Sequence, residues 1–347
     1  MDASELYSDL SEESKQVLYE LANEIKEERN GEPRGRVILF LGAAANYHAP
    51  EGFEEAYSKT DRPPIGSELN NLLIDEIFSP KISESRNRAM KEERLSLSYT
   101  AQYLQETKDR KRLIEKLAEV IDNKKPSPIL RALAEMNFKY IVTTNYDNLF
   151  EEALFEVGKK EYHKGVYQAN ITGTPKPTFS PGEEASVKKP FIYKFHGDIK
   201  NAVDEQGNYV KDGDSIVLTD EDYLHFILRM SQVSDNKEKT SNKENLDFYP
   251  VPQPINEAFI GKNQNTFLFI GYGLQDYNLR LIFKTSLWKK DQNIFKELQK
   301  WSIAIGQHKP IMGFYTKNYN FTFIEHNIWC AVSYLYKAMF DKEMPLK

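Results

Sequence analysis

Tyr140-Ile-Val-Thr-Thr-Asn-Tyr-Asp147 is the stretch of this 347-residue chain that decides its fold. The β-branched run at 141–143 is typical of a buried strand, and the apolar spacing after Asp147 is typical of an amphipathic helix. The apolar face of that helix is Leu149, Phe150, Ala153, Leu154 and Val157. Asn145 and Asp147 therefore follow the carboxyl end of a strand and open a helix. In open α/β sheets, nucleotides bind at this edge of the sheet.

A structural interpretation of Asn145 competes with a binding role. Asn is among the residues most favoured at the amino-terminal cap of a helix, so Asn145 taken alone would be a cap. A binding role for Asn145 is supported by three other segments of the chain, because in each of them a strand also ends in a turn.

Three other segments end a strand in a chemically useful turn. Residues 36–46 are a buried-type strand that runs into the small-residue turn Gly-Ala-Ala-Ala-Asn. Residues 191–197 are a strand that ends in His196-Gly, and residues 266–276 are a strand that ends in Gly-Tyr-Gly before another helix. The chain thus carries a small-residue turn, Asn-x-Asp, His-Gly and Gly-x-Gly, each after a strand and in this order.

This ordered quartet resembles the sirtuin superfamily over roughly residues 36–330. Within it, the chain looks like the bacterial sirtuin-like NAD hydrolases of anti-phage defence rather than the protein deacetylases. The resemblance implies an α/β fold with a Rossmann-like, mostly parallel sheet, a helical insertion and flanking helices. We expect an amino-terminal helix within residues 1–30 that ends near Asn30-Gly31, the sirtuin-like domain over 31–347, and the insertion at about 66–136. Within the domain we expect strands at 37–41, 302–305 and 321–324 and a closing helix at 328–340.

The resemblance implies cleavage of NAD, with Asn145 and His196 as the catalytic residues. Asn145 would position the attacking water and the nicotinamide ribose, since an amide orients water without demanding a particular pH. His196 would be the base, because the pKa of a histidine lies near working pH. A His before Gly is also common as a plain turn residue, and that alternative stays open for His196.

The resemblance also assigns residues to NAD binding: Gly42, Ala43, Ala44, Thr144, Asp147, Gly271, Gly273 and Asp276. The pyrophosphate would lie over free backbone N–H groups of the turn at 42–45, and the turn at 271–273 would accept the adenosine half. Asp147 would support the nicotinamide amide or the local network. Asp276 would reach a ribose hydroxyl or cap the helix that follows it. Thr144 stands where the family usually has Gln.

Two departures from the sirtuin pattern bear on function. Ala44 adds a methyl group where the family usually has Gly, at a point of close backbone approach or positive φ. The deacetylases hold zinc with two cysteine pairs, whereas this chain has Cys330 alone. We therefore expect no zinc or other metal, and hydrolysis in place of peptide deacylation.

Composition limits the remaining possibilities. The net charge of −6 gives no global basic field, so we expect no direct nucleic-acid binding. The acidic amino terminus and the absence of a long apolar run indicate a protein of the cytoplasm with no membrane segment. The polar run at 234–245 predicts a surface loop.

The resulting expectation is an NAD hydrolase that depletes NAD in abortive anti-phage defence. Because unrestrained hydrolysis would poison the host, we expect control by homo-oligomerisation or by a separate partner, such as the HerA-type ATPases or short Argonaute proteins found with family members. The alternative is a non-catalytic sensor or scaffold that binds NAD or ADP-ribose, which the altered Gly-Ala-Ala-Ala-Asn turn favours slightly.

Overall fold

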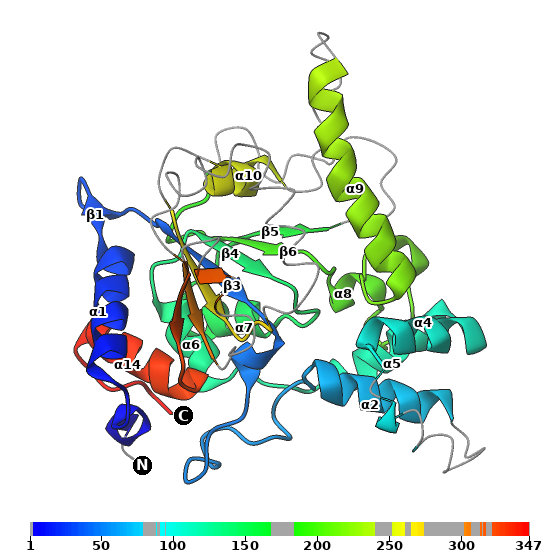
Figure 1. Ribbon diagram of the computed structural model, residues 1–347, viewed down its shortest axis with the longest axis horizontal. Coiled ribbons are helices and arrows are strands. Elements are labelled where there is room, and N and C mark those ends of the chain that lie inside the picture. The colour runs from blue at the N-terminus through cyan, green and yellow to red at the C-terminus, as the bar shows by residue number, and fades with distance from the viewer. Residues whose placement is uncertain are drawn as a thin grey trace.

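A parallel seven-stranded sheet forms the centre of the computed structural model (Figure 1). The structure describes residues 3–78, 88, 91–93, 95–167, 184–239, 252–260, 265–273, 302–306, 313, 315–316 and 321–346. The strands of the sheet are β3 (Val37–Leu41), β4 (Tyr140–Thr143), β5 (His163–Val166), β6 (Phe191–Lys194), β7 (Thr266–Ile270), β8 (Ser302–Ile305) and β9 (Phe321–Ile324).

The strand order is β5-β6-β4-β3-β7-β8-β9, and every neighbouring pair is parallel. With β5 set aside, this is the usual 3-2-1-4-5-6 order of the Rossmann fold. From β3 the chain builds one half of the sheet, which contains β4, β5 and β6. It then returns to the other side of β3 and builds the second half outward from β7 to β9. The predicted Rossmann-like fold is therefore confirmed, and the strand order reverses between β3 and β7.

Alternation along the strands gives the sheet two different faces. Residues 37, 39 and 41 of β3 join an aliphatic cluster, whereas Ile38 and Phe40 join a cluster rich in Phe and Tyr. The aliphatic face is covered by α1 (Glu12–Lys26), α6 (Pro128–Glu135), α7 (Leu149–Glu156) and α14 (Ile328–Phe340). The aromatic face is covered by α10 (Gln253–Ile260) and the first turns of α9 (Asp220–Lys239). Burial of both faces explains why these strands read as continuous apolar runs.

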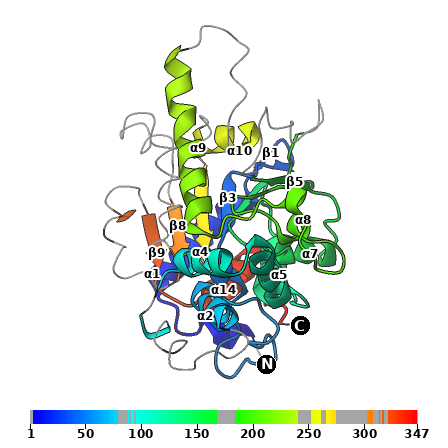
Figure 2. The same cartoon turned by 90° about the vertical axis from the view of Figure 1, so that its right-hand side faces the viewer.

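A separate helical module packs beside the sheet, at the lower right of Figure 1. Its helices are α2 (Gly66–Ile77), α4 (Leu97–Thr107) and α5 (Arg110–Ile121), which share a third apolar cluster with α8 (Ile199–Ala202). Helix α6, also within the range 66–136, packs instead on the sheet side against α7 and α14. Figure 2 shows α4 beside the lower part of α9, which rises away from the module.

The amino-terminal helix packs on its own chain. The buried residues of α1 join the aliphatic cluster, and Glu24 accepts a 2.6 Å hydrogen bond from Thr266 of β7. The helix ends at Lys26, whereas Asn30-Gly31 was predicted to end it. These two residues form the turn between β1 (Glu28–Arg29) and β2 (Glu32–Pro33), with φ of 56° and 78°. Asn-Gly is the preferred sequence for such a tight hairpin turn.

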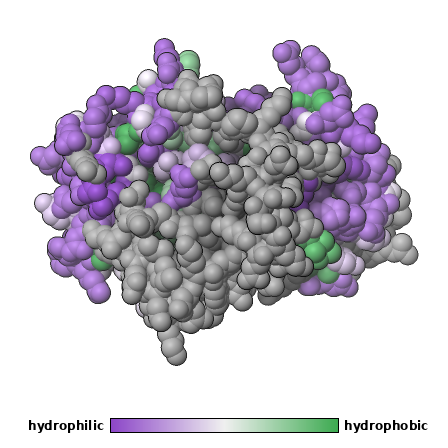
Figure 3. All heavy atoms as spheres, turned by 90° about the horizontal axis from the view of Figure 1, so that it is seen from above, coloured by the Kyte–Doolittle hydropathy of each residue, from purple (hydrophilic) through white to green (hydrophobic). Residues whose placement is uncertain are grey.

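The polar run at 234–245 also differs from prediction. Helix α9 continues to Lys239, so the first part of the predicted loop is helical, and the rest lies outside the described residues. Seen from above, the visible described surface is mostly hydrophilic, with isolated hydrophobic spots (Figure 3). Among the described helices, none has the length and apolar character to cross a membrane.

Candidate functional site

The register of the sheet brings four of the predicted motifs to one edge. Leu41 of β3 pairs with Thr143 of β4 and with Ile270 of β7, and Thr143 pairs with Lys194 of β6. The turns that follow these four strands therefore lie side by side at the carboxyl edge, where the strand order reverses. Asp276 lies outside the described residues, so its predicted contact with ribose stays a prediction.

The first turn and the late Gly-x-Gly turn pack directly on each other. The Gly42 N–H donates to Ile270 O at 2.9 Å, and the Ala44 N–H donates to Gly271 O at 3.1 Å. A Cβ on Gly271 would lie 2.0 Å from Ala45 N, and φ at Gly271 is +72°. Gly271 is therefore required for this backbone approach. Gly273 is exposed, and a Cβ there would meet no atom within 4 Å.

The backbone amides of the first turn are mostly in use. Besides Gly42 and Ala44, the Ala45 N–H donates to Gly42 O at 3.0 Å. The turn is the short 3-10 helix η2 (Ala43–Asn46), in which Ala44 does not take positive φ. The methyl group of Ala44 is thus compatible with the turn. Binding of a pyrophosphate over this turn stays a prediction. Because these amides already donate within the protein, fewer of them would be available to the pyrophosphate than the sequence indicated.

Asn145 does not cap the helix that follows it. Its Nδ2 donates to Gly42 O at 3.3 Å, which ties the end of β4 to the first turn. The N-cap residue of α7 is Asn148, and the first helical N–H, that of Leu149, is accepted by Asp147 Oδ1 at 3.0 Å. The cap interpretation of Asn145 is therefore wrong. Because a carbonyl oxygen accepts from Nδ2, the orientation of the amide is defined, and Oδ1 is available as an acceptor.

The Asn145 Oδ1 atom is buried and has no hydrogen-bond partner among the described residues. The preceding residue, Thr144, holds the turn through its N–H, which donates to Leu41 O at 3.4 Å. The Thr143 hydroxyl accepts the Asn145 N–H at 3.0 Å and donates to Leu41 O at 2.8 Å. Hydrogen bonds to Leu41 and Thr143 thus fix the backbone around Asn145. Its amide oxygen remains an unsatisfied acceptor among the described residues, as expected of a ligand-binding group.

Asp147 belongs to the turn that follows Asn145 and is partly buried. Burial raises the pKa of its carboxyl to about 6, and the charge of Lys194 opposes that rise. Asp147 therefore has a role in the α7 terminus that the sequence did not reveal, and its predicted support of nicotinamide stays a prediction.

His196 follows β6 at the position that matches Asn145 on the neighbouring strand. The paired residues Thr143 and Lys194 each lie two residues before them. The His196 side chain is 3% exposed and lies among aromatic rings, with ring centroids 5.5 Å from Tyr223 and 6.3 Å from Tyr146. The structure thus brings the two predicted catalytic residues to adjacent strand ends, where His196 is buried and Asn145 is partly buried.

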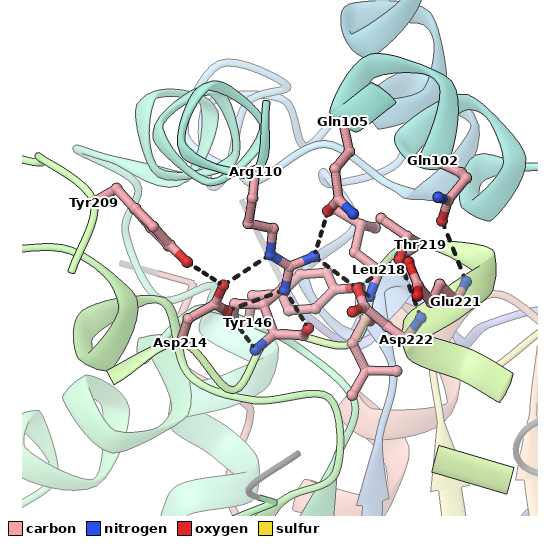
Figure 4. A network of polar contacts seen from close by, with 12 residues as sticks. Gln102, Gln105, Arg110, Tyr146, Tyr209, Asp214, Leu218, Thr219, Glu221 and Asp222 are labelled. Carbon is pink, nitrogen blue, oxygen red and sulfur yellow. Dashed lines mark hydrogen bonds and ion pairs between the residues drawn. The ribbon is translucent and has the colours of Figure 1, made fainter. Parts of the chain in front are cut away.

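The segment at 214–219 forms a wall against both of these turns. The Val217 N–H donates to His196 O at 3.1 Å, and the Tyr146 hydroxyl donates to Val217 O at 3.0 Å. Arg110 holds this segment to the helical module, reaching from α5 between Asp214 and Asp222 at 2.7 and 2.8 Å (Figure 4). These carboxylates raise the pKa of Arg110 above its usual value despite its burial. One ion-pair network thus joins the helical module to the segment that packs on the Asn145 and His196 turns.

Sequence reasoning missed a buried charged cluster under the Asn145 turn. It consists of Lys164, Lys194, Glu151 and Asp198, with Lys194 and Asp198 fully buried. The available signal was a lysine within the otherwise apolar strand 191–195, since buried lysines need partners.

Asn46, at the end of the first turn, was also not singled out. Its side chain is 1% exposed, and neither its Nδ2 nor its Oδ1 has a hydrogen-bond partner among the described residues. A buried amide with no partner is destabilising by about 1–3 kcal/mol per group. Its position makes it a candidate contact for a bound molecule.

The described residues include no group of three His, Cys, Asp or Glu side chains that could hold a metal ion. Cys330 is buried in α14, where burial raises the pKa of its thiol to about 11. A thiol of that kind is a packing group rather than a nucleophile at neutral pH.

A doubly wound parallel sheet with polar side chains at the reversal of strand order defines a Rossmann-like fold, the class in which ligands commonly bind at that edge. Residues 139–324 match the family model of the SIR2-like domain. The match covers more than half of the chain, and the chain belongs to this family.

Two curated relatives are similar to it. Defense-associated sirtuin 2 of Bacillus subtilis is 26% identical over 188 residues, which are 54% of this chain and 13% of that protein. The NAD(+) hydrolase ThsA of Acinetobacter baumannii (strain 532279) is 26% identical over 201 residues, 57% of this chain and 32% of that protein. The chain thus spans a third or less of the length of these relatives.

Proposed function

We propose that this chain hydrolyses NAD to ADP-ribose and nicotinamide. The observation that carries the proposal is the Asn145 amide, whose Nδ2 bonds to Gly42 while its buried Oδ1 lacks a partner among the described residues. An acceptor held in this way suits a water molecule or a ribose hydroxyl. One of the two named relatives is an NAD(+) hydrolase, which supports the choice of substrate.

The reaction requires little covalent chemistry from the protein. The bond between C1′ of the ribose and the nicotinamide nitrogen breaks, and its electron pair leaves with neutral nicotinamide. The oxygen of water then bonds to C1′, and one proton of that water must be removed. Asn145 would orient the water through Oδ1, and His196 on the adjacent strand end would accept the proton. The burial of His196 favours this assignment, because the oxocarbenium-like centre must be shielded from bulk solvent.

Substrate binding would extend along the same edge. We assign Asn46 to it as a further contact, because an amide with both of its groups buried and unsatisfied is complementary to a ligand that offers a donor and an acceptor. Gly273, exposed beside the first turn, remains the candidate for the adenosine half.

We also propose a role in anti-phage defence through NAD depletion, as the name of the Bacillus subtilis relative suggests. Such an activity needs restraint, so control by homo-oligomerisation or by a separate partner, such as a HerA-type ATPase or a short Argonaute, belongs to the proposal.

The test is nicotinamide release from NAD by purified protein over a wide range of protein concentration. Asn145→Ala and His196→Ala should each lower release by roughly 100-fold or more, while Asn46→Ala should mainly raise KM. A steep dependence on protein concentration would support activation by assembly. NAD binding without release at any concentration, alone or with the product of a neighbouring gene, would refute hydrolysis and favour the sensor.

A further inference from the structure

Lys194 is the last residue of β6, and its ammonium group reaches under the Asn145 turn. Its side chain is fully buried. The Nζ atom donates to Asp147 O at 2.5 Å, to Asn148 Oδ1 at 2.5 Å and to Tyr146 O at 3.4 Å. One side chain therefore contacts three consecutive residues, and these immediately follow Asn145.

Two acidic groups balance this charge without being its closest partners. Glu151 of α7 lies 3.7 Å and Asp198 lies 3.5 Å from the Lys194 Nζ. Lys164 of β5 supplies the second cation of the cluster, 3.5 Å from Glu151 and paired with Asp198. The cluster thus holds two cations and two anions, and its shortest Lys194 contacts go to the turn.

Stability alone is a weak reason for such a cluster. A buried ion pair is often no more stabilising than well-packed apolar residues of the same volume. The face of β6 that carries Lys194 also carries Ile192 in the aliphatic cluster, so an apolar side chain would suit the site as well. What an apolar side chain would not supply is three hydrogen bonds to the backbone and side chain of the turn.

We propose that Lys194 is the positioning residue that holds the Asn145–Asn148 turn in the conformation required for catalysis. It acts from below the turn, through the Tyr146 and Asp147 carbonyl oxygens and the Asn148 side chain, and does not touch substrate. The catalytic half of this inference rests on the proposed NAD hydrolysis, whereas the ordering of the turn does not.

Removing one lysine alone would leave an excess buried anion, so the test uses charge-balanced pairs. Lys194→Met with Glu151→Gln removes one charge of each sign and all three contacts to the turn. Lys164→Met with Glu151→Gln likewise removes one cation and one anion from the cluster, and it leaves the Lys194 contacts in place. Equal far-UV circular dichroism and similar Tm values would show that both variants are folded.

The first readout is steady-state nicotinamide release. We expect the Lys194 pair to lower kcat by roughly 10- to 100-fold with KM within about 3-fold of wild type, because the reacting groups are misplaced while binding is kept. The Lys164 pair should stay within about 3-fold of wild type in both constants. Equal losses of kcat in the two pairs would overturn a specific role for Lys194.

The second readout is amide hydrogen exchange in peptides that cover residues 144–150, compared with peptides from α14. We expect exchange in 144–150 to be about 10-fold faster in the Lys194 pair only, with α14 unchanged. Unchanged exchange at 144–150 would overturn the proposal even in an active enzyme. Faster exchange there in a protein that releases no nicotinamide would support the positioning role and refute the proposed function instead.

Discussion

Gly271→Ala should separate the structural part of the Gly-x-Gly turn from its binding part. The new Cβ would lie 2.0 Å from Ala45 N and 2.5 Å from Ala44 C, and both are backbone atoms that cannot rotate away. The residue would also have to keep a φ of +72°, which is destabilising by about 1–2 kcal/mol for a residue with a Cβ. Relief of the overlap would lengthen the 3.1 Å hydrogen bond from Ala44 to Gly271 O, which is worth about 1 kcal/mol.

The expected loss is therefore about 2–3 kcal/mol, with a fall in Tm of roughly 4 °C or more for a chain of this size. Gly273→Ala is the matched control, because the same methyl group two residues later meets no atom within 4 Å. That variant should unfold within about 1 °C of wild type. If Gly273 lines the adenosine site, its KM for NAD should rise. Thermal unfolding followed by tryptophan fluorescence makes the comparison, and equal Tm values for the two variants would refute the packing argument.

Two further predictions concern charge. Arg110→Met should lower the free energy of unfolding by about 2–4 kcal/mol, since it leaves Asp214 and Asp222 without their shared cation. The control, Lys111→Met, changes an exposed side chain and should alter the free energy of unfolding little. The midpoints of urea unfolding measure both effects. Burial raises the pKa of Asp147 to about 6. The folded state therefore keeps a proton that the unfolded state loses near pH 4. As a result, the contribution of Asp147 to the free energy of unfolding falls as pH rises from about 4 to 6. Asp147→Asn should therefore gain Tm relative to wild type between pH 4.5 and pH 7, and a constant difference would contradict the raised pKa.

The strands could be predicted from the sequence because their signals are local. The predicted strands at 37–41, 302–305 and 321–324 and the closing helix at 328–340 match the structure at both ends. Short β-branched or aromatic runs bounded by turn residues are read without knowledge of their partners. The predicted helix end near Asn30 was wrong because Asn-Gly is common both at the end of a helix and in the turn of a β-hairpin. Only the pairing of Glu28 with Pro33 shows that the hairpin forms here.

The site was predictable only in part, for a physical reason. Parallel strands align their carboxyl ends, so motifs at those ends meet whatever the loops between them do. The supporting contacts lack such a rule. Arg110 and Asp214 are 104 residues apart, and Lys194 at the end of β6 bonds to Asn148, 46 residues earlier, beyond the end of the neighbouring strand β4. The sequence showed a lysine in an apolar strand, but the identity of its partners depends on which helix covers that face.

The first turn bears on the choice between enzyme and sensor. Ala44 in place of the family's usual Gly was the one feature that favoured a sensor, because a methyl group there was expected to meet a phosphate or a forbidden φ. In the structure the turn is a 3-10 helix without positive φ at Ala44, and the close backbone approach is made by Gly42 and Gly271. The substitution thus leaves intact both the turn and the Gly42 carbonyl that orients Asn145. The feature that favoured a sensor is therefore removed. The oriented Asn145 oxygen would serve a ribose hydroxyl as well as an attacking water, so nicotinamide release by the wild-type protein is the measurement that separates the two functions.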